Sequence, residues 1–300
     1  MNGHFIDGTT RLVGLIGWPV RHSRSPVVHN AAFAALGLNW RYVPLPTPPA
    51  RVGEAVRGLV ALGFRGANVT VPHKETVLPY LDALAPAAAA LGAVNTLVID
   101  RSGDASADIR GHNTDVPGFL AALRSGDFEP QGKRAIVIGA GGAARAVVYA
   151  LLSAGAQKVT VLNRTPSRAV ALVDDLAPHA QATALHGAPL TAERLVEAAY
   201  GAHLLVNATT VGMWPHTHAS IWPDEASIPA HLTVMDLVYR PRETRLLAQA
   251  RAAGAHPIDG LGMLIHQGAL AFDLWTAHAH DLEEIGAIME SALLKRRAAL

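Results

Sequence analysis

The feature that most constrains this chain is a glycine-rich turn between an apolar strand and an apolar helix. Residues 134–138 read Arg-Ala-Ile-Val-Ile, and residues 146–152 continue as an apolar helical run. Glycines let the backbone turn tightly and approach a pyrophosphate, and a helix N-terminus supplies free N–H groups. An ordinary tight turn is the alternative, but the order strand, turn, helix and next strand favours a dinucleotide site. The turn consists of Gly139, Ala140, Gly141, Gly142 and Ala143.

This turn belongs to a longer alternation of strand-like and helix-like segments. Such alternation predicts an α/β architecture with mainly parallel sheets. The proline-rich residues 44–49 are expected to form a short rigid connection. We expect strands over residues 12–16, 67–71, 94–99, 134–138, 158–162, 203–207 and 233–237, and helices over residues 26–36, 54–62, 143–154 and 167–176.

The length of 300 residues favours two domains, at roughly 150 residues for each. The polar, turn-rich residues 125–133 precede the first strand of a new sheet, and a second boundary is expected near residues 256–261. We therefore predict a first domain over residues 1–124, completed by the closing helices of residues 261–300. The second domain is predicted over residues 125–260.

Composition excludes several classes of protein. A net charge of +1 gives no general attraction to nucleic acid or to anionic lipid. The absence of cysteine excludes disulfide scaffolds, zinc–thiolate sites and cysteine nucleophiles. No apolar run reaches the length of about 18 residues that a membrane span needs, and residues 1–10 do not resemble a signal peptide. We therefore expect a soluble, cytoplasmic protein.

Histidine-rich segments invite a metal site, but their spacing does not support one. His216 and His218 lie in a loop rich in tryptophan and proline, and His278 and His280 are two apart on an expected helix. Residues two apart on a helix point in different directions. Neither pair has the spacing of a catalytic zinc site, so we expect no metal.

The strand at residues 158–162 is followed by Asn163, Arg164 and Thr165, with Arg168 close behind. NAD sites usually place an acidic residue here to bind the ribose hydroxyls, whereas arginine can bind a 2′-phosphate by charge-assisted hydrogen bonds. The alternative is a pair of solvated surface arginines. The position at the strand tip favours NADP.

Residues 207–213 also follow an expected strand. They form either a loop beside the ligand or an ordinary turn.

The first domain carries polar residues beside turns. Ser23 and Ser25 precede an expected helix that begins at Pro26, where Ser25 would be a good helix cap. Lys74 follows a strand that ends at a proline, and Asn95 lies beside turn residues. Asp115 is either a ligand-binding carboxylate or the cap of the next helix. Together these residues suggest a small ligand rich in hydroxyl groups.

Taken together, these motifs resemble those of the shikimate dehydrogenase family, and the resemblance covers nearly the whole chain. The resemblance implies an N-terminal α/β substrate domain, completed by the C-terminal helices, and a Rossmann domain for NADP. The motifs that carry it are His-Ser23-Arg-Ser25-Pro, Asn-Val-Thr70-Val-Pro-His-Lys74, Gly-Ala-Val-Asn95-Thr, Asn-Thr-Asp115, Gly139-Ala-Gly-Gly-Ala143, Asn163-Arg164-Thr165 and Asp-Gly260-Leu-Gly-Met263-Leu-Ile-His-Gln267.

The resemblance also implies roles for individual residues. Reduction of 3-dehydroshikimate to shikimate by NADPH, in aromatic amino acid biosynthesis, would use Lys74 and Asp115 as the catalytic pair. Ser23 and Ser25 would bind the substrate carboxylate with Tyr239 nearby, and Thr70, Asn95 and Gln267 would bind ring hydroxyls. The pyrophosphate would lie on residues 139–143, and the 2′-phosphate on residues 163–168. The nicotinamide side would be lined by Leu237, Gly260 and Met263.

The sequence departs from the family pattern at two residues, and two alternative functions remain open. His73 and Leu237 stand where the family often has other residues, and His73 could perturb its neighbour Lys74. A quinate or dual quinate/shikimate dehydrogenase is the nearest alternative, although Ser25 and the Asn163–Thr165 motif favour shikimate and NADP. A non-catalytic NADP-binding regulatory protein would be expected to lack Lys74 or Asp115. We expect a monomer or a homodimer.

Overall fold

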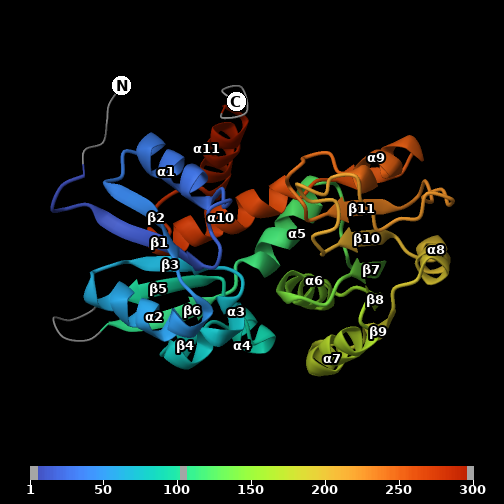
Figure 1. The fold of residues 1–300 in the computed structure, drawn as a ribbon, viewed down its shortest axis with the longest axis horizontal. Helices are drawn as coiled ribbons and strands as arrows, with labels where there is room; N and C mark the ends of the chain where they lie inside the picture. The colour runs from blue at the N-terminus through green and yellow to red at the C-terminus, as the bar shows by residue number, and fades with distance from the viewer. Residues whose placement is uncertain (1–5, 102–106, 296–300) are drawn as a thin grey trace. The chain divides into compact units, whose positions relative to one another are not determined.

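The computed structural model describes residues 6–101 and 107–295, which divide into two compact units. One unit comprises Met1–Thr114 and Ile265–Leu300, and the other comprises Asp115–Leu264. Each unit is a six-stranded sheet covered by helices (Figure 1), which confirms the predicted α/β class. Residues 1–5, which are half of the segment 1–10 considered above for a signal peptide, lie outside the described residues.

The sheet of the first unit mixes parallel and antiparallel pairs. Its strand order is β2-β1-β3-β5-β6-β4, and β5 is antiparallel to both of its neighbours while the other pairs are parallel. This agrees with the expectation of a mainly parallel sheet. The strands are β1 (Arg11–Gly17), β2 (Trp40–Pro46), β3 (Gly66–Val69), β4 (Ala83–Leu84), β5 (Thr96–Asp100) and β6 (Asp108–His112).

The proline-rich connection was wrongly predicted. Pro44 and Pro46 lie within β2, where they pair in register with Leu15 and Gly17 of β1. Proline lacks a backbone N–H and is normally excluded from the middle of a sheet. It is tolerated here because β2 is the edge strand of its sheet, with a neighbour on one side only.

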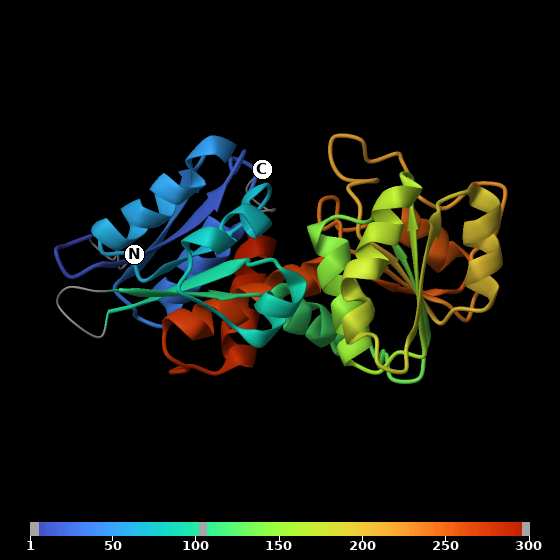
Figure 2. The ribbon, with the colours of Figure 1, turned by 90° about the horizontal axis from the view of Figure 1, so that it is seen from below.

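The C-terminal segment returns to the first sheet, as predicted. Phe272 stacks on Phe33 at 4.6 Å between ring centroids, and Trp275 Nε1 donates to the Leu97 carbonyl of β5 at 2.9 Å. Figure 2 shows the C-terminal helices, in red, on one side of this sheet. The helices are α1 (Ser25–Ala35), α2 (Val52–Ala61), α3 (His73–Thr76), α4 (Pro86–Leu91), α10 (Leu261–Trp275) and α11 (Leu282–Lys295).

The sheet of the second unit is entirely parallel, with the order β12-β11-β10-β7-β8-β9. The chain starts at the central strand β7, extends to β9 on one side and then to β12 on the other. This is the strand order of a Rossmann fold, in which ligands bind at the carboxyl ends of the strands where the order reverses. The strands are β7 (Arg134–Ile138), β8 (Lys158–Asn163), β9 (Ala184–Pro189), β10 (Leu204–Asn207), β11 (Thr233–Asp236) and β12 (His256–Ile258).

Helices cover both faces of this sheet, and Figure 2 shows α6 and α7 on one side with α8 on the other. Because both faces are covered, the strands read as continuous apolar runs: residues 135–138 of β7 are all buried. Threonine hydroxyls cap α8 and α9, each accepting a backbone N–H from the first turn. The helices are α5 (Asp115–Ser125), α6 (Gly142–Ser153), α7 (Pro166–Leu176), α8 (Ala192–Tyr200) and α9 (Arg245–Ala252).

One helix groups differently from the predicted boundary. The sequence places residues 115–124 in the first domain, whereas α5 groups with the second unit. The physical reason is that α5 packs against α6 and buries Phe119, Ala122 and Leu123. The domain bounds predicted from the sequence, residues 1–124 with 261–300 and residues 125–260, stay a prediction.

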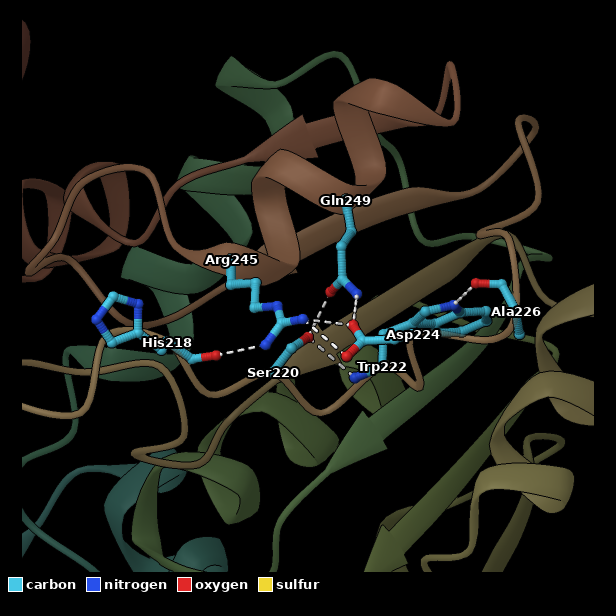
Figure 3. Close-up of polar contacts among 7 residues, drawn as sticks. All are labelled: His218, Ser220, Trp222, Asp224, Ala226, Arg245 and Gln249. Carbon is cyan, nitrogen blue, oxygen red and sulfur yellow. Dashed lines mark hydrogen bonds and ion pairs between the residues drawn. The ribbon is translucent and has the colours of Figure 1, made fainter.

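The connection between β10 and β11 has no helix or strand, and α9 holds it in place (Figure 3). Arg245 donates to both carboxylate oxygens of Asp224 at 2.7 Å and to the His218 carbonyl at 2.8 Å. Gln249 donates to Asp224 at 3.1 Å and accepts from the Ser220 hydroxyl at 2.6 Å. These contacts fix the outer part of a long loop at the surface.

Candidate functional site

The glycine turn of the second unit has the geometry expected of a phosphate cradle. Gly139 has a φ of +114°, and a Cβ there would lie 3.1 Å from Thr209 Cγ2 and 3.2 Å from the Ala208 carbonyl oxygen. Gly141 is the N-cap residue of α6 and gives the helix no side-chain cap, and a Cβ on it would meet nothing within 4 Å. The first N–H groups of a helix have no partner within the helix. The turn therefore offers N–H donors on an open surface, as pyrophosphate binding requires.

Two arginines follow β8: Arg164 lies directly after the strand and Arg168 lies in the first turn of α7. Arg164 and Arg168 are both exposed, and within residues 6–101 and 107–295 neither guanidinium has an acidic partner. Asn163 Nδ2 donates to the Thr165 carbonyl at 2.9 Å, which holds the bend between strand and helix. Two exposed cations close after this strand fit a 2′-phosphate.

The residues predicted for the nicotinamide side include a very close backbone contact. A Cβ on Gly260 would lie 2.4 Å from the Leu237 carbonyl oxygen, so only glycine fits there. Leu237 itself is tied to β10, because its N–H donates to the Asn207 carbonyl at 3.0 Å. Met263 is buried in the first turn of α10. The structure thus brings Leu237 and Gly260 together.

The segment after β10 is a turn built by Asn207. Its Oδ1 accepts from the Thr209 N–H at 3.1 Å and from the Thr209 hydroxyl at 2.7 Å. Its amide also donates to Asp236 Oδ1 at 2.9 Å. Burial raises the pKa of Asp236 to about 6, against the effect of its hydrogen bonds. The sequence interpretation missed Asp236, although an aspartate directly after the apolar pair Val234 and Met235 at the end of an expected strand is a visible signal.

The serine pair of the first unit lies at the start of α1. The prediction that Ser25 caps the helix is wrong, because Ser25 is the first helical residue and Arg24 is the cap position. The Ser23 hydroxyl instead accepts from the Ser25 N–H at 3.2 Å. Both serines are half-buried. Their hydroxyl groups are neutral donors of the kind that a carboxylate would need.

Behind the serines lies a buried aromatic pair. The His29 ring stacks on Tyr42 at 4.4 Å between centroids, and its Nδ1 lies 2.9 Å from the Ser25 carbonyl oxygen. Burial lowers the pKa of His29 to about 4, so the ring is neutral near pH 7. Burial raises the pKa of the Tyr42 phenol, and a hydrogen bond with the Ser25 side chain opposes this effect. Neither residue was predicted, because each reads as an ordinary core residue in the sequence.

A buried polar network surrounds Asn95. Its Oδ1 accepts from the Thr114 N–H at 2.8 Å and from the Thr96 hydroxyl at 3.0 Å, and its Nδ2 donates to Thr114 Oγ1 at 2.9 Å. Asn68 donates to the Asn95 carbonyl at 3.2 Å and to Thr96 Oγ1 at 3.1 Å. A fully bonded buried network holds its side chains in one arrangement. Asn95 is therefore a rigid group.

Lys74 lies beside this network. The Val94 N–H donates to the Lys74 carbonyl at 2.8 Å, which joins the lysine segment to the asparagine segment. His73 points into the protein, where its Nε2 lies 2.7 Å from the Thr47 carbonyl oxygen, whereas Lys74 is half-buried. Thr70 packs so closely on β1 that a Cβ on Gly17 would lie 2.3 Å from its Cγ2.

The remaining predicted residues fall in both units. Gln267 is half-buried on α10 in the first unit. Asp115 is buried in the first turn of α5 and directly follows Thr114, while Tyr239 follows β11 and is half-buried. Both belong to the second unit. The structure thus places the serines, Lys74 and Asn95 in one unit and the glycine turn in the other.

No group of three or more metal-ligating side chains occurs in the part of the chain that the structure describes. His216 and His218 are exposed in the β10–β11 connection, and His278 pairs with Asp273 at 2.6 Å. Among the described residues, no helix is long and apolar enough to cross a membrane.

Comparison with known families gives matches along most of the chain. Residues 15–97 match the shikimate dehydrogenase substrate binding domain, residues 121–217 match shikimate / quinate 5-dehydrogenase, and residues 260–284 match the shikimate 5′-dehydrogenase C-terminal domain. A shikimate dehydrogenase (NADP⁺) of Moorella thermoacetica is 46% identical over 293 residues, covering 96% of this chain and 95% of the relative.

Solved structures agree. Shikimate 5-dehydrogenase from Thermus thermophilus in complex with NADP(H) and shikimate has a TM-score of 0.80 and 40% identity, covering 94% of this chain and 100% of the other. Quinate dehydrogenase from Corynebacterium glutamicum in complex with NAD has a TM-score of 0.84 and 35% identity, covering 94% and 99%. The predicted resemblance is confirmed, and the chain belongs to the shikimate dehydrogenase family.

Proposed function

We propose that this protein reduces 3-dehydroshikimate to shikimate with NADPH and also runs the reverse reaction. The observation that carries the proposal is the hydrogen bond from the Val94 N–H to the Lys74 carbonyl, which joins the segment that carries Lys74 to the segment that carries the rigid Asn95 network. A cation next to fixed polar groups suits a carbonyl substrate rich in hydroxyls. Relatives that carry the name shikimate dehydrogenase (NADP⁺) cover nearly the whole chain. The reaction belongs to aromatic amino acid biosynthesis.

Substrate binding is assigned to residues at the strand ends and on α10. Ser23 and Ser25 donate hydrogen bonds to the carboxylate, since both hydroxyls lie at the entry to α1. Tyr239 contributes a phenol to the same group. The ring hydroxyls are bound by Thr70, Asn95 and Gln267.

Lys74 carries the proton that the reduction needs. NADPH, when bound, supplies a hydride to the ring carbonyl carbon, and negative charge then grows on the carbonyl oxygen. The Lys74 ammonium stabilises that charge and donates a proton to it, and in the oxidation the amine takes the proton back. Asp115 orients Lys74 and a substrate hydroxyl. Asn95 holds the ring so that the carbonyl faces the lysine.

The second unit fits NADP. The turn at Gly139 is open at Gly141, where the N-terminus of α6 supplies N–H donors for the pyrophosphate. Arg164 and Arg168 are exposed cations for the 2′-phosphate, with Asn163 and Thr165 shaping the bend between them. The nicotinamide side is formed by Leu237, Gly260 and Met263, and the pyrophosphate turn also includes Ala140, Gly142 and Ala143.

A quinate or dual quinate/shikimate activity is the second candidate. The Corynebacterium glutamicum quinate dehydrogenase shares the fold at 35% identity, so the scaffold alone does not select the substrate. Ser25 and Arg164 favour shikimate and NADP in this chain. A cytoplasmic location and a monomeric or homodimeric state accompany the proposal, and light scattering after size-exclusion chromatography tests the second of these.

The test measures initial rates with shikimate and with quinate, each with NADP and with NAD. We expect the combination of shikimate and NADP to dominate. Equal or faster rates with quinate or with NAD would transfer the protein to the dual-specificity candidate. If all four rates were zero for a folded chain that binds NADPH, the protein would be a non-catalytic NADP-binding protein.

A further inference from the structure

A buried carboxylate ends the strand β11 in the second unit. Asp236 has an exposed fraction of 0%, and no cation in the described part of the chain pairs with it. Its Oδ1 accepts from Asn207 Nδ2 at 2.9 Å and from the Val238 N–H at 3.0 Å, and its Oδ2 accepts from the Thr244 hydroxyl at 2.7 Å. Burying a carboxylate without a cation costs free energy. Three donors from three chain segments offset that cost.

The carboxylate dictates which way the Asn207 amide points. A carboxylate can only accept hydrogen bonds, so the NH₂ group of Asn207 must face Asp236. The amide oxygen then faces the other way, where it accepts from the N–H and the hydroxyl of Thr209. The NH₂ group also donates to the Val211 carbonyl at 3.2 Å. Asp236 therefore determines the turn of residues 207–211.

Thr244 links the same carboxylate to α9. Its hydroxyl donates to Asp236 and accepts from the Leu247 N–H at 3.3 Å, so one hydroxyl both caps the helix and anchors to the strand end. Gly212 has a φ of +87°, and a Cβ there would lie 3.7 Å from Thr244 Cβ. The loops after β10 and β11 thus meet around one carboxylate.

These loops adjoin the residues assigned to the cofactor. Asn207 pairs in register with Asp236 on one side and with Ile138 on the other, so all three lie in one row at the carboxyl ends of adjacent strands. Gly139 follows Ile138, and Thr209 Cγ2 would lie 3.1 Å from a Cβ on that glycine. Leu237 follows Asp236. We infer that Asp236 is a positioning residue that fixes the loops of residues 208–213 and 237–243 for NADP binding.

This inference rests on the proposed NADP site but not on the substrate. The direct comparison is Asp236→Ala against Asp236→Asn. Alanine leaves the Asn207, Val238 and Thr244 donors without an acceptor, whereas asparagine keeps one acceptor oxygen and places an amide opposite the Thr244 oxygen. Because burial raises the pKa of Asp236 to about 6, the neutral asparagine also resembles the protonated side chain.

The experiment measures NADPH affinity by fluorescence titration and, without ligand, the amide hydrogen exchange of residues 208–213. Asp236→Ala is expected to weaken NADPH binding by about tenfold or more and to speed the exchange, while Asp236→Asn stays within about threefold of the native affinity. The matched control is Asp224→Ala, which removes an exposed carboxylate from the same connection (Figure 3) and should leave NADPH affinity unchanged.

A folded Asp236→Ala chain with native NADPH affinity would overturn the inference. If that variant does not fold, Thr244→Val decides, because it removes one of the donors while keeping the side-chain size; native affinity and slow exchange in it would overturn the inference too. A native chain that binds NADPH but does not oxidise shikimate would overturn the proposed function alone. The comparison of the Asp236 variants with the native chain needs only NADPH, so it tests the inference even in that case.

Discussion

The Tyr42 hydroxyl donates a hydrogen bond of 2.8 Å to Asn68 Oδ1, and both side chains are buried. Asn68 in turn donates to Thr96, and Thr96 donates to Asn95. The phenol is therefore the start of a chain of hydrogen bonds that leads from the helix α1 side of the first unit to the amide assigned to the substrate hydroxyls.

Replacing Tyr42 by phenylalanine should weaken substrate binding more than turnover. The change leaves Asn68 Oδ1 buried without a donor, at a cost of roughly 1–3 kcal/mol in the free energy of unfolding. We expect the KM for shikimate to rise about tenfold while kcat changes by less, because Asn95 loses its fixed orientation. Steady-state rates and urea unfolding test both effects. Tyr200→Phe, at an exposed tyrosine, is the control and should change neither.

Replacing Lys74 by alanine should remove turnover and leave cofactor binding intact. Loss of a positioned proton donor typically lowers rates by roughly 100- to 10,000-fold. NADPH affinity should stay native, because Lys74 lies in the first unit and the glycine turn in the second. Rates and a fluorescence titration of NADPH separate these effects. Lys158→Ala, at an exposed lysine, controls for the loss of a charge, and near-native kcat in Lys74→Ala would exclude the lysine as the proton donor.

Replacing Arg164 by alanine should reduce the preference for NADP over NAD. A charge-assisted hydrogen bond contributes about 1.5–3 kcal/mol, so the KM for NADP should rise by roughly 10- to 100-fold. The KM for NAD, which has no 2′-phosphate, should not change. Arg194→Ala on α8 is the matched control, since Arg194 is also an exposed arginine of the second unit. Equal increases for both cofactors would assign Arg164 to general binding instead.

Local patterns predicted the parts of the fold whose signal is contained in a short segment. The strand β7, the glycine turn and α6 were predicted because an apolar run, glycines and a helical run follow one another directly. The strand β2 was missed because its prolines suggest a connection, and only its place at the edge of the sheet makes them acceptable. The order of the strands is a property of the assembled sheet.

The candidate site likewise contains residues with a local sequence signal and residues without one. The glycine turn and the arginines Arg164 and Arg168 were predicted as cofactor residues from their place after expected strands, and these roles stay predictions. Tyr42 and Asp236 were not predicted, because their importance comes from partners that are distant in the sequence: Asn68 for the tyrosine and Asn207 for the aspartate. The helix-cap interpretation of Ser25 was wrong by a single position, which is the usual uncertainty of a helix end.

Adding a methyl group at Gly260 should disturb the nicotinamide side. The new Cβ would lie 2.4 Å from the Leu237 carbonyl oxygen, so one backbone must move. We expect Gly260→Ala to lower the free energy of unfolding by roughly 1–3 kcal/mol and to weaken NADPH binding. Gly58→Ala is the control: a Cβ in this helix interior meets nothing within 4 Å, and alanine there should stabilise by about 0.5–1 kcal/mol. Native NADPH affinity in Gly260→Ala would show that Leu237 tolerates displacement.

The two units should respond to acid in opposite directions. The pKa of His29 falls from 6.5 to about 4 on folding, so the unfolded chain binds the extra proton and the first unit loses stability as the pH drops from about 6.5 to 4. The pKa of Asp236 rises from 3.8 to about 6, so the folded chain binds the extra proton and the second unit gains stability as the pH drops from about 6 to 4. Each difference corresponds to about 3 kcal/mol at most in the free energy of unfolding.

The pH dependence of the stability of each unit is measured by hydrogen exchange of its peptides at about pH 4.5 and 6.5, corrected for intrinsic exchange rates. His29→Gln should reduce the acid sensitivity of the first unit, and Asp236→Asn should abolish the acid stabilisation of the second. If both units weakened together on acidification, burial of Asp236 would not control its proton.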